Sequence, residues 1–589
     1  MSPERPRRID PITVEVVAKG IAAAAREMGI TLRQTSSSPI FNEGNDYSCA
    51  IFDAHGRLVS HGEFLPIHLG SLPFSVNHAV EEIGRDQLAP GDSIVLNDPF
   101  RGGSHLPDVT LVTPIFLDGR LLGFAANRAH HLDIGGTVAG SFYAQARENY
   151  QEGLRLPPTR LVKRGVLDEE LMALIQANVR LPRQTRADLL SQLSANLTAA
   201  ERMAELVGRY GLDTVNACMD LVMDDSERRM RAVIATWPDG RYQAEDSMDN
   251  DGITDVPRTV RVTVEVHGDS LTVDFTGTDP QVEGPLNSVL GYSCSGVYMT
   301  VQAATDPDIP PNDGCYRPVR IVAPEGTIVN PRFPAACTGG NEITSVIHNA
   351  TFRALAQIPR EPGRCPRVMA GDQGSSNNLF LSGWDDDSGE RFVLYEYPEG
   401  GWGATDGRDG LNAVYSIIGN TWNLPVEAVE LRYPIRIDRY ELRTDSGGPG
   451  RWRGGLSVRR AYRLLAERGE LSLLGNRVRV PPFGLYGGAS GAPARYTLDP
   501  GTPDERPAAP EFGAKKHQIP LRRGQVILQE TAGGGGFGDP FQRPPEEVGR
   551  DVALGYVSVE AAFEHYGVVV DEAGNVDHDA TARRRGQRR

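Results

Sequence analysis

The sequence has no apolar run long enough to cross a membrane. Every uninterrupted apolar stretch falls short of the roughly 20 residues that a bilayer span requires. The N-terminal segment MSPERPRRID has no apolar core behind its arginines, so it does not have the pattern of a secretory signal. We therefore expect a protein that does not enter a membrane.

Cysteine is rare, and no two cysteines form a Cys-x-x-Cys pair. The chain has six: Cys49, Cys218, Cys294, Cys315, Cys337 and Cys365. This scattered spacing argues against a zinc–thiolate site and against a disulfide framework. The expected location is the reducing cytoplasm.

Basic residues are outnumbered by acidic ones. The chain contains 61 Lys and Arg against 77 Asp and Glu, which gives a formal net charge of −16. Nucleic acids and anionic membranes bind to basic surfaces, so neither is expected as a partner. The one basic cluster, Arg583 to Arg589, is short and polar, and we predict that it is a disordered tail.

The sequence also lacks a loop for binding nucleotide phosphates. No G-x-x-x-x-G-K-[ST] motif occurs in it. Residues Gly533 to Gly538 (GGGGFG) match G-x-G-x-x-G by letter, but Asp539-Pro540 follows and no helix is expected to begin there. The dinucleotide fingerprint requires that helix. Any ATP that takes part in the reaction is therefore expected on another chain.

Glycine and proline, by contrast, are frequent along the whole chain. The sequence has 65 Gly and 42 Pro, which predicts many short strands joined by ordered loops. Its 589 residues exceed the roughly 250–300 at which one core stops growing. We predict an α+β, multi-lobed chain with antiparallel sheets. It would comprise a metal-site α+β region, a helical block, a second α+β region rich in strands and glycine loops, and a C-terminal extension: residues 1–165, 166–237, 238–540 and 541–589.

Hydrophobic periodicity locates the main elements. Alternating apolar residues at 259–266 and 271–275, joined by a turn, predict an antiparallel hairpin. Apolar residues at helical spacing predict helices at 10–32, over most of 166–237, and at 287–304, 345–356 and 411–418.

The stretch from Asn97 to Gly136 carries the strongest chemical signal. Two apolar β runs flank Asp118-Gly119, which is typical of a hairpin turn. Imidazole and carboxylate groups together suit a divalent ion such as zinc, manganese or iron. A role as caps or hydrogen-bonded core groups is the alternative, but three of the 12 histidines in one window favour a metal site. The hairpin would gather five such residues at one end: His105, Asp108, His130, His131 and Asp133.

Three further residues are weaker candidates. Asp46 begins its strand as Asp108 does, so it could join the same cluster, although an Asp at this position is usually a cap or turn residue. Glu148 and Glu152 are spaced to share one helical face. Either could be a general acid or base near the metal, and a solvated pair is the alternative.

Seven segments together resemble the hydantoinase B family. They are DPITVEVV, NEGNDYSCAIFD, NDPFRGGSHLPDVTLVTPIF, RAHHLDIGG, CTGGNEITS, RTDSGGPGRWRGG and TAGGGGFGDP, in the family's order. This family includes the B subunits of ATP-dependent N-methylhydantoinases, the matching half of 5-oxoprolinases, and the α subunit of acetone carboxylases.

The resemblance implies a metal site on Asp46, His105, Asp108 and His130. It also implies an A subunit, which carries ATP-Mg in an actin-like ATPase fold, and a hetero-oligomer of two A and two B subunits. The partner would phosphorylate the amide oxygen of a cyclic amide, and this chain would deliver water. Its predicted proton-transfer residue is His131 or Glu152, on proximity in sequence.

By this resemblance the chain is the metal-binding, hydrolytic subunit of an ATP-dependent hydrolase that opens a hydantoin- or 5-oxoproline-like ring. One alternative is a subunit of an acetone-carboxylase-like carboxylase. The other is a non-catalytic scaffold for the A subunit. Acetone carboxylase α subunits are longer than this chain, which favours the hydrolase.

Overall fold

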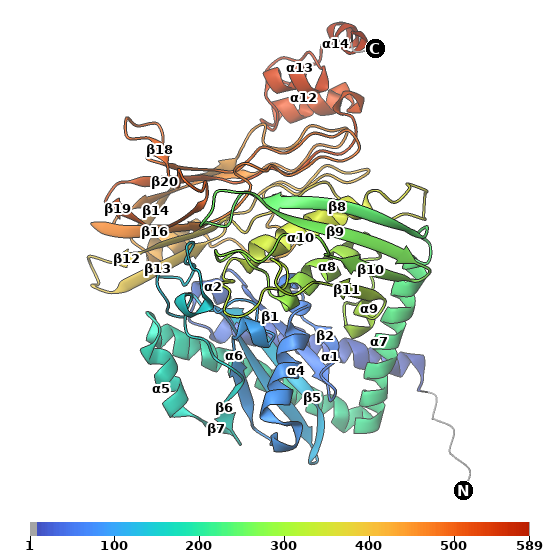
Figure 1. Ribbon diagram of the computed structural model, residues 1–589, viewed down its shortest axis with the longest axis vertical. Coiled ribbons are helices and arrows are strands. Elements are labelled where there is room, and N and C mark those ends of the chain that lie inside the picture. The colour runs from blue at the N-terminus through green and yellow to red at the C-terminus, as the bar shows by residue number, and fades with distance from the viewer. Residues whose placement is uncertain (1–8, 588–589) are drawn as a thin grey trace.

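The computed structural model describes residues 9–587 of the chain. Among these residues the named strands form four sheets, of seven, four, four and five strands, with helices packed against them (Figure 1). The strand pairs are antiparallel apart from the parallel pair β10–β11. The predicted α+β class is confirmed. None of the helices in this part of the chain combines the length and the apolar character needed to cross a bilayer.

The seven-stranded sheet contains the hairpin predicted between Asn97 and Gly136. Its strands pair in the order β2-β1-β5-β4-β3-β6-β7. The turn between β4 and β5 has Asp118 at φ 50° and Gly119 at φ 75°, as a type I′ turn requires. The strands are β1 (Tyr47–Asp53), β2 (Leu58–His61), β3 (Ser93–Leu96), β4 (Asp108–Leu117), β5 (Arg120–His130), β6 (Thr159–Lys163) and β7 (Val166–Leu167).

Helices cover both faces of this sheet. α4 (Leu72–Ile83) packs on one face, against the side chains of Phe52 and Phe124. α1 (Pro11–Thr35) and α6 (Pro182–Tyr210) cover the other face, where Ile51 is buried. Successive residues of a strand point to opposite faces, so this arrangement explains why β1 is buried along its whole length. Two short helices, α2 (Pro39–Asn42) and α3 (Pro66–Leu69), flank β1 and β2.

The predicted helical block begins at α5 (Glu169–Ala177), because Val166 and Leu167 form β7 and pair with β6. α6 and α7 (Leu212–Ile234) follow, separated by Gly211 at φ 84°. The largest buried apolar cluster extends from Val17 on α1 to Leu474 in the second half of the chain. The three larger predicted regions therefore share one core.

A four-stranded sheet and two buried helices form the next layer. The predicted hairpin at 259–266 and 271–275 is confirmed as β9 and β10. Helices α8 (Leu290–Ala304) and α10 (Gly340–Leu355) lie side by side, with β8 and β9 against α10 (Figure 1). This layer contains β8 (Gly240–Met248), β9 (Arg258–His267), β10 (Ser270–Asp274), α9 (Asp313–Tyr316) and β11 (Val319–Val322).

The two remaining sheets pair in the orders β13-β12-β16-β19 and β14-β15-β20-β17-β18. The helix predicted at 411–418 is wrong. The amides of Ala413 and Val414 instead donate to the carbonyls of Leu456 and Gly400, and Ala413 has φ 50°. This part of the chain contains β12 (Asn378–Trp384), β13 (Arg391–Glu396), α11 (Val426–Arg432), β14 (Ile435–Leu442), β15 (Val458–Leu464), β16 (Arg468–Leu474), β17 (Arg495–Leu498), β18 (Arg506–Pro507), β19 (Lys515–Arg522) and β20 (Val526–Glu530).

The described part of the C-terminal extension contains three α-helices with their own small apolar cluster, at the end of the molecule far from the N-terminal sheet (Figure 1). They are α12 (Pro545–Ala553), α13 (Val559–Tyr566) and α14 (His578–Gly586). The predicted disordered tail is wrong for Arg583–Arg585, which lie in α14, where Arg585 donates to the carbonyls of Tyr566 and Arg543. Gly586 ends the same helix, whereas the last two residues of that tail, 588–589, and most of the N-terminal segment considered as a signal, 1–8, lie outside the described residues.

Candidate metal centre

The hairpin brings the predicted ligands together from three points in the sequence. Its register places Asp108, the first residue of β4, opposite His130, the last residue of β5. His105 lies in the loop that enters β4, and its carbonyl accepts from the Asp108 amide. Asp46 lies just before β1, and its carbonyl accepts from the His130 amide. These backbone hydrogen bonds and the strand pairing together position the backbone of the candidate ligands.

Three donor atoms of this cluster form a nearly equilateral triangle. The distances are 3.0 Å from His105 Nε2 to His130 Nδ1, and 3.1 Å from Asp108 Oδ1 to each of these nitrogens. All three side chains are buried. Burial lowers the pKa of His105 to about 3, so its imidazole is neutral at pH 7. Burial alone would raise the pKa of Asp108, but the imidazoles of His105 and His68 hold it well below its ordinary value.

This triangle fits a divalent ion. Ligands at about 2.0–2.1 Å around a tetrahedral ion lie about 3.3 Å from one another, close to the edges observed here. Neutral imidazoles and an ionised carboxylate are the protonation states that bind metals. His130 Nε2 is buried and has no hydrogen-bond partner in the described part of the chain, which leaves a donor or acceptor free for a bound molecule.

Asp46 lies in the wall of the same cavity but outside the triangle. Its side chain is buried, and burial raises its pKa to about 7. It is not part of the group of ligand atoms that lie within 4.8 Å of one another, which contains His105, Asp108 and His130. The structure thus brings together three of the four predicted ligands and places the fourth beside them.

Three residues that the sequence did not indicate hold the second oxygen of Asp108. Tyr292 on α8 donates its hydroxyl to Oδ2 at 2.6 Å, and His68 Nε2 on α3 lies 3.2 Å from the same atom. Ser104 also donates to it. No local signal marks Tyr292, because it is 184 residues away from Asp108 in the sequence. His68 is different, because it ends a polar-rich segment, 61–68, that begins with another histidine. This segment could have been suspected of reaching the predicted ligands.

His131 and Asp133 do not join the cluster, contrary to the prediction. His131 Nε2 lies 2.9 Å from Gln192 Oε1 on α6, and its ring packs edge-on against Phe41. Asp133 instead accepts from the amides of Gly135 and Gly140. The position of His131 gives no support to its predicted proton-transfer role.

Glu152 also lies away from the cavity wall. Its carboxylate accepts from the backbone amides of Cys337 and Thr338 at 2.8–3.0 Å, and from the Asn149 side chain at 2.9 Å. Burial raises its pKa to about 7, against the effect of these hydrogen bonds. Glu152 therefore anchors the loop that leads into α10, and Asn341 in the first turn of α10 lines the cavity.

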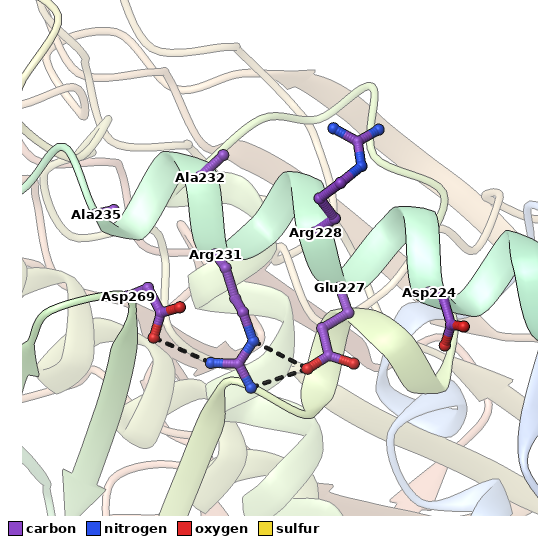
Figure 2. A pocket seen from close by; sticks show the side chains of 7 residues that line it. All are labelled: Asp224, Glu227, Arg228, Arg231, Ala232, Ala235 and Asp269. Carbon is purple, nitrogen blue, oxygen red and sulfur yellow. Dashed lines mark hydrogen bonds and ion pairs between the residues drawn. The ribbon is translucent and has the colours of Figure 1, made fainter.

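The cavity around the triangle is small, with about 30 Å³ of free volume. Aromatic and hydroxyl side chains complete its wall, among them Tyr292, Tyr395, Tyr415 and Ser376. A larger surface groove, of about 450 Å³, lies along α7 and is bordered mainly by charged residues (Figure 2). There Arg231 bonds to Glu227 and Asp269, so these charges satisfy one another and indicate no site.

A family model described as hydantoinase B/oxoprolinase matches residues 10–540. The chain belongs to the hydantoinase B/oxoprolinase family. The match begins at Asp10 and ends at Pro540, so it spans all seven segments that carry the predicted resemblance. The resemblance is confirmed. The C-terminal helices α12 to α14 lie beyond the match.

Individual relatives cover nearly the whole chain. The B subunit of a putative D-/L-hydantoinase from Pseudomonas sp. (strain NS671) is 34% identical over 98% of this chain and 98% of its own length. The crystal structure of ATP-dependent caprolactamase from Pseudomonas jessenii has a TM-score of 0.91 and 32% identity, and it covers 98% of this chain and 100% of that one. A nucleotide-free structure of acetone carboxylase has a TM-score of 0.90, over 98% of this chain and 83% of that one. Its identity is 21%, so it shows a shared fold alone.

Proposed function

We propose that this chain is the metal-binding, hydrolytic subunit of an ATP-dependent cyclic-amide hydrolase that acts on a hydantoin- or 5-oxoproline-like ring. The observation that carries the proposal is the triangle of donor atoms from His105, Asp108 and His130, buried at the end of the hairpin. The relatives named hydantoinase and ATP-dependent caprolactamase support a cyclic amide as the substrate.

The proposed ligands are His105, Asp108 and His130, with Asp46 beside them, and the proposed ion is zinc, manganese or iron. When bound, such an ion lowers the pKa of water and polarises a carbon–oxygen bond. Tyr292 orients the Asp108 carboxylate by donating to its second oxygen. The buried walls of the cavity exclude bulk water, which strengthens every electrostatic interaction inside.

ATP has a chemical purpose in this proposal, because a cyclic amide is a poor electrophile until its oxygen is activated. The sequence has no phosphate-binding loop, so we place ATP-Mg on an A-type partner. The relatives include a hydantoinase B subunit and a caprolactamase beta subunit, which supports a partner, and two A with two B subunits is the proposed assembly. A cytoplasmic location is also proposed, and the six free cysteines agree with a reducing compartment.

The test is to co-express the chain with its A-type partner and to measure metal content and ATP-dependent opening of hydantoin, 5-oxoproline and ε-caprolactam. We expect about one metal ion per chain. His105→Ala should lose the ion and reduce turnover more than about 100-fold. His55→Ala, at an exposed turn, is the matched control and should retain both.

Each alternative gives a different result in the same experiment. No ATP-dependent product from any of the rings would reject the hydrolase. A bicarbonate-dependent product from a ketone would identify a carboxylase subunit. Full turnover with His105→Ala would indicate a non-catalytic scaffold.

A further inference from the structure

A second, larger cavity lies next to the metal centre. Its volume is about 500 Å³, within the range of about 300–1,000 Å³ that is typical of small-molecule sites. Apolar side chains from four separate segments form most of its wall: Phe64, Leu69, Met299, Trp402, Val414 and Ile417.

The two cavities share structural elements and one residue. Gly419 lines both of them. Tyr292 lines the metal cavity and Met299 the apolar one, and they lie seven residues apart on α8, so they share a face about 10 Å apart along the helix. Met299 also packs against a buried cluster that includes Ile67 and Ile418, two residues of the metal cavity. The two cavities are therefore adjacent, and Gly419 lies at their boundary.

The metal cavity has no room for the body of a ring. Its volume of about 30 Å³ would hold two or three water molecules, since each needs about 10–15 Å³. Only the reacting amide could enter it, so the remaining atoms of the substrate need a second space that adjoins Gly419.

The apolar cavity is unsuited to an anionic group. Among the residues that the structure describes, no Lys or Arg lines it, and the one acidic residue in its wall, Glu63, is paired with Arg26 at 2.8 Å. Burial lowers the pKa of His61, so this imidazole is neutral at pH 7. A carboxylate placed there would lose its hydration without gaining a cation, which is strongly unfavourable.

The apolar cavity also continues towards the surface. It shares His61, Glu63, Pro307 and Pro311 with a groove of about 1180 Å³ lined by residues of α1 and α7. A substrate could therefore enter along this groove without displacing the metal ligands.

We propose that the apolar cavity binds the hydrocarbon part of the substrate, and that this chain acts on neutral cyclic amides with an apolar body, not on rings that carry a carboxylate. This inference rests on the proposed function and narrows its substrate class. The amide would reach the metal cavity at Gly419, where the two cavities meet.

The test uses the complex with the A-type partner and two probes, ε-caprolactam and 5-oxoproline. Binding is measured by titration calorimetry, and ring opening by ATP-dependent product formation. The wild type should bind the lactam and prefer it in kcat/KM by about tenfold or more. Met299→Trp should fill the cavity and weaken lactam binding about tenfold with unchanged metal content. Met299→Lys should shift the preference towards 5-oxoproline.

Leu174→Trp, on the exposed side of α5, is the matched control and should leave both probes unaffected. If Met299→Trp fails to fold, Gln302→Trp adds the same bulk one turn along α8. Preference for 5-oxoproline, no binding of either probe, or unchanged lactam binding in the folded Trp variant would overturn the inference. Lactam binding that is lost in Met299→Trp, without ATP-dependent ring opening in the wild type, would reject the proposed function and retain this cavity as the binding site.

Discussion

At the scale of single residues, Asp108 organises the site because its two oxygens have different neighbours. Oδ1 faces His105 and His130, and Oδ2 takes hydrogen bonds from Tyr292 and Ser104. A carboxylate held on one side in this way cannot rotate freely, so the other oxygen stays directed at the two imidazoles. Groups that orient a ligand commonly change metal affinity about 10–100-fold when they are removed.

This arrangement predicts the effect of Tyr292→Phe. The variant removes the hydroxyl that donates to Asp108 at 2.6 Å, and it keeps the ring. We expect metal affinity to fall about tenfold, measured by competition with a chelator of known affinity. Tyr298→Phe, further along α8, is the control, because Tyr298 packs by stacking its ring on Tyr316. Equal affinities in the two variants would show that Tyr292 does not support the ligand.

The buried carboxyl group of Asp188 on α6 should make the stability of the protein depend on pH. Burial raises its pKa to about 7, although the amides of Ser37 and Ser38 donate to its carboxylate. The folded protein binds this proton more tightly than the unfolded chain does. The resulting stabilisation is therefore complete below the ordinary pKa of 3.8 and is lost as the pH rises through about 7.

Asp188→Asn keeps an accepting oxygen but does not titrate. The difference between the free energies of unfolding of this variant and of the wild type should rise in favour of the variant between pH 4 and pH 8, by up to about 4 kcal/mol. Denaturant unfolding of both proteins at several pH values measures this difference. A difference that stays constant over the whole range would mean that Asp188 is not buried as a neutral acid.

The ligand residues of β4 and β5 could be predicted because a hairpin turn relates positions that lie close in sequence. The same proximity groups His131 with them, but neighbouring residues at a strand end point to opposite sides of the sheet. His130 therefore faces the cavity, and His131 faces Gln192. Tyr292 could not be predicted, since only the packing of α8 on the sheet brings it to Asp108.

At the scale of elements, the β4–β5 turn depends on a backbone conformation that favours glycine. Gly119 has φ 75°, and no atom lies within 4 Å of the position that a Cβ would take there, so Gly119→Ala would meet no clash and only backbone strain. Gly208, in α6, also has open space but ordinary helical geometry. Gly119→Ala should destabilise the protein by about 1 kcal/mol, and Gly208→Ala should stabilise it by about 0.5–1 kcal/mol.

Midpoints of thermal unfolding at one scan rate should move in opposite directions for these two variants. Each adds the same methyl group, so each serves as the control for the other. Shifts of the same sign would mean that side-chain volume, and not φ, determines the response at Gly119.

Periodicity correctly predicted the elements whose backbone hydrogen bonds form within one helix or between two strands that follow each other in the sequence. α1, the β4–β5 hairpin and the β9–β10 hairpin are of this kind. The segment 411–418 has helical spacing of apolar residues, but its amides bond to carbonyls far away in sequence. Long-range pairing of this kind leaves no periodic signal in the sequence. The spacing of apolar residues therefore predicted a helix, and the long-range hydrogen bonds form instead.

At the scale of the whole molecule, Glu152 joins two distant regions of the chain. It follows the N-terminal hairpin, and it accepts from the amides of Cys337 and Thr338, nearly 190 residues later. These amides begin the loop that leads into α10, which carries Asn341 to the metal cavity. Glu152 thus holds the second half of the cavity wall against the first.

Two substitutions separate this anchoring role from the proton transfer first predicted for Glu152. Glu152→Ala leaves the buried Cys337 and Thr338 amides without an acceptor, which should cost about 2–5 kcal/mol of stability. Glu152→Gln retains one accepting oxygen. It should therefore recover part of that stability and most of the turnover, with the metal content unchanged in both variants.

Glu170→Ala, at an exposed position in α5, is the control and should change stability by less than about 0.5 kcal/mol. Unfolding midpoints, metal content and ATP-dependent turnover should be measured on the same preparations of the complex. A proton-transfer residue would show the opposite pattern, because glutamine cannot carry the proton. Glu152→Gln would then fold stably but lose about 100-fold or more in turnover, and the anchoring role would be rejected.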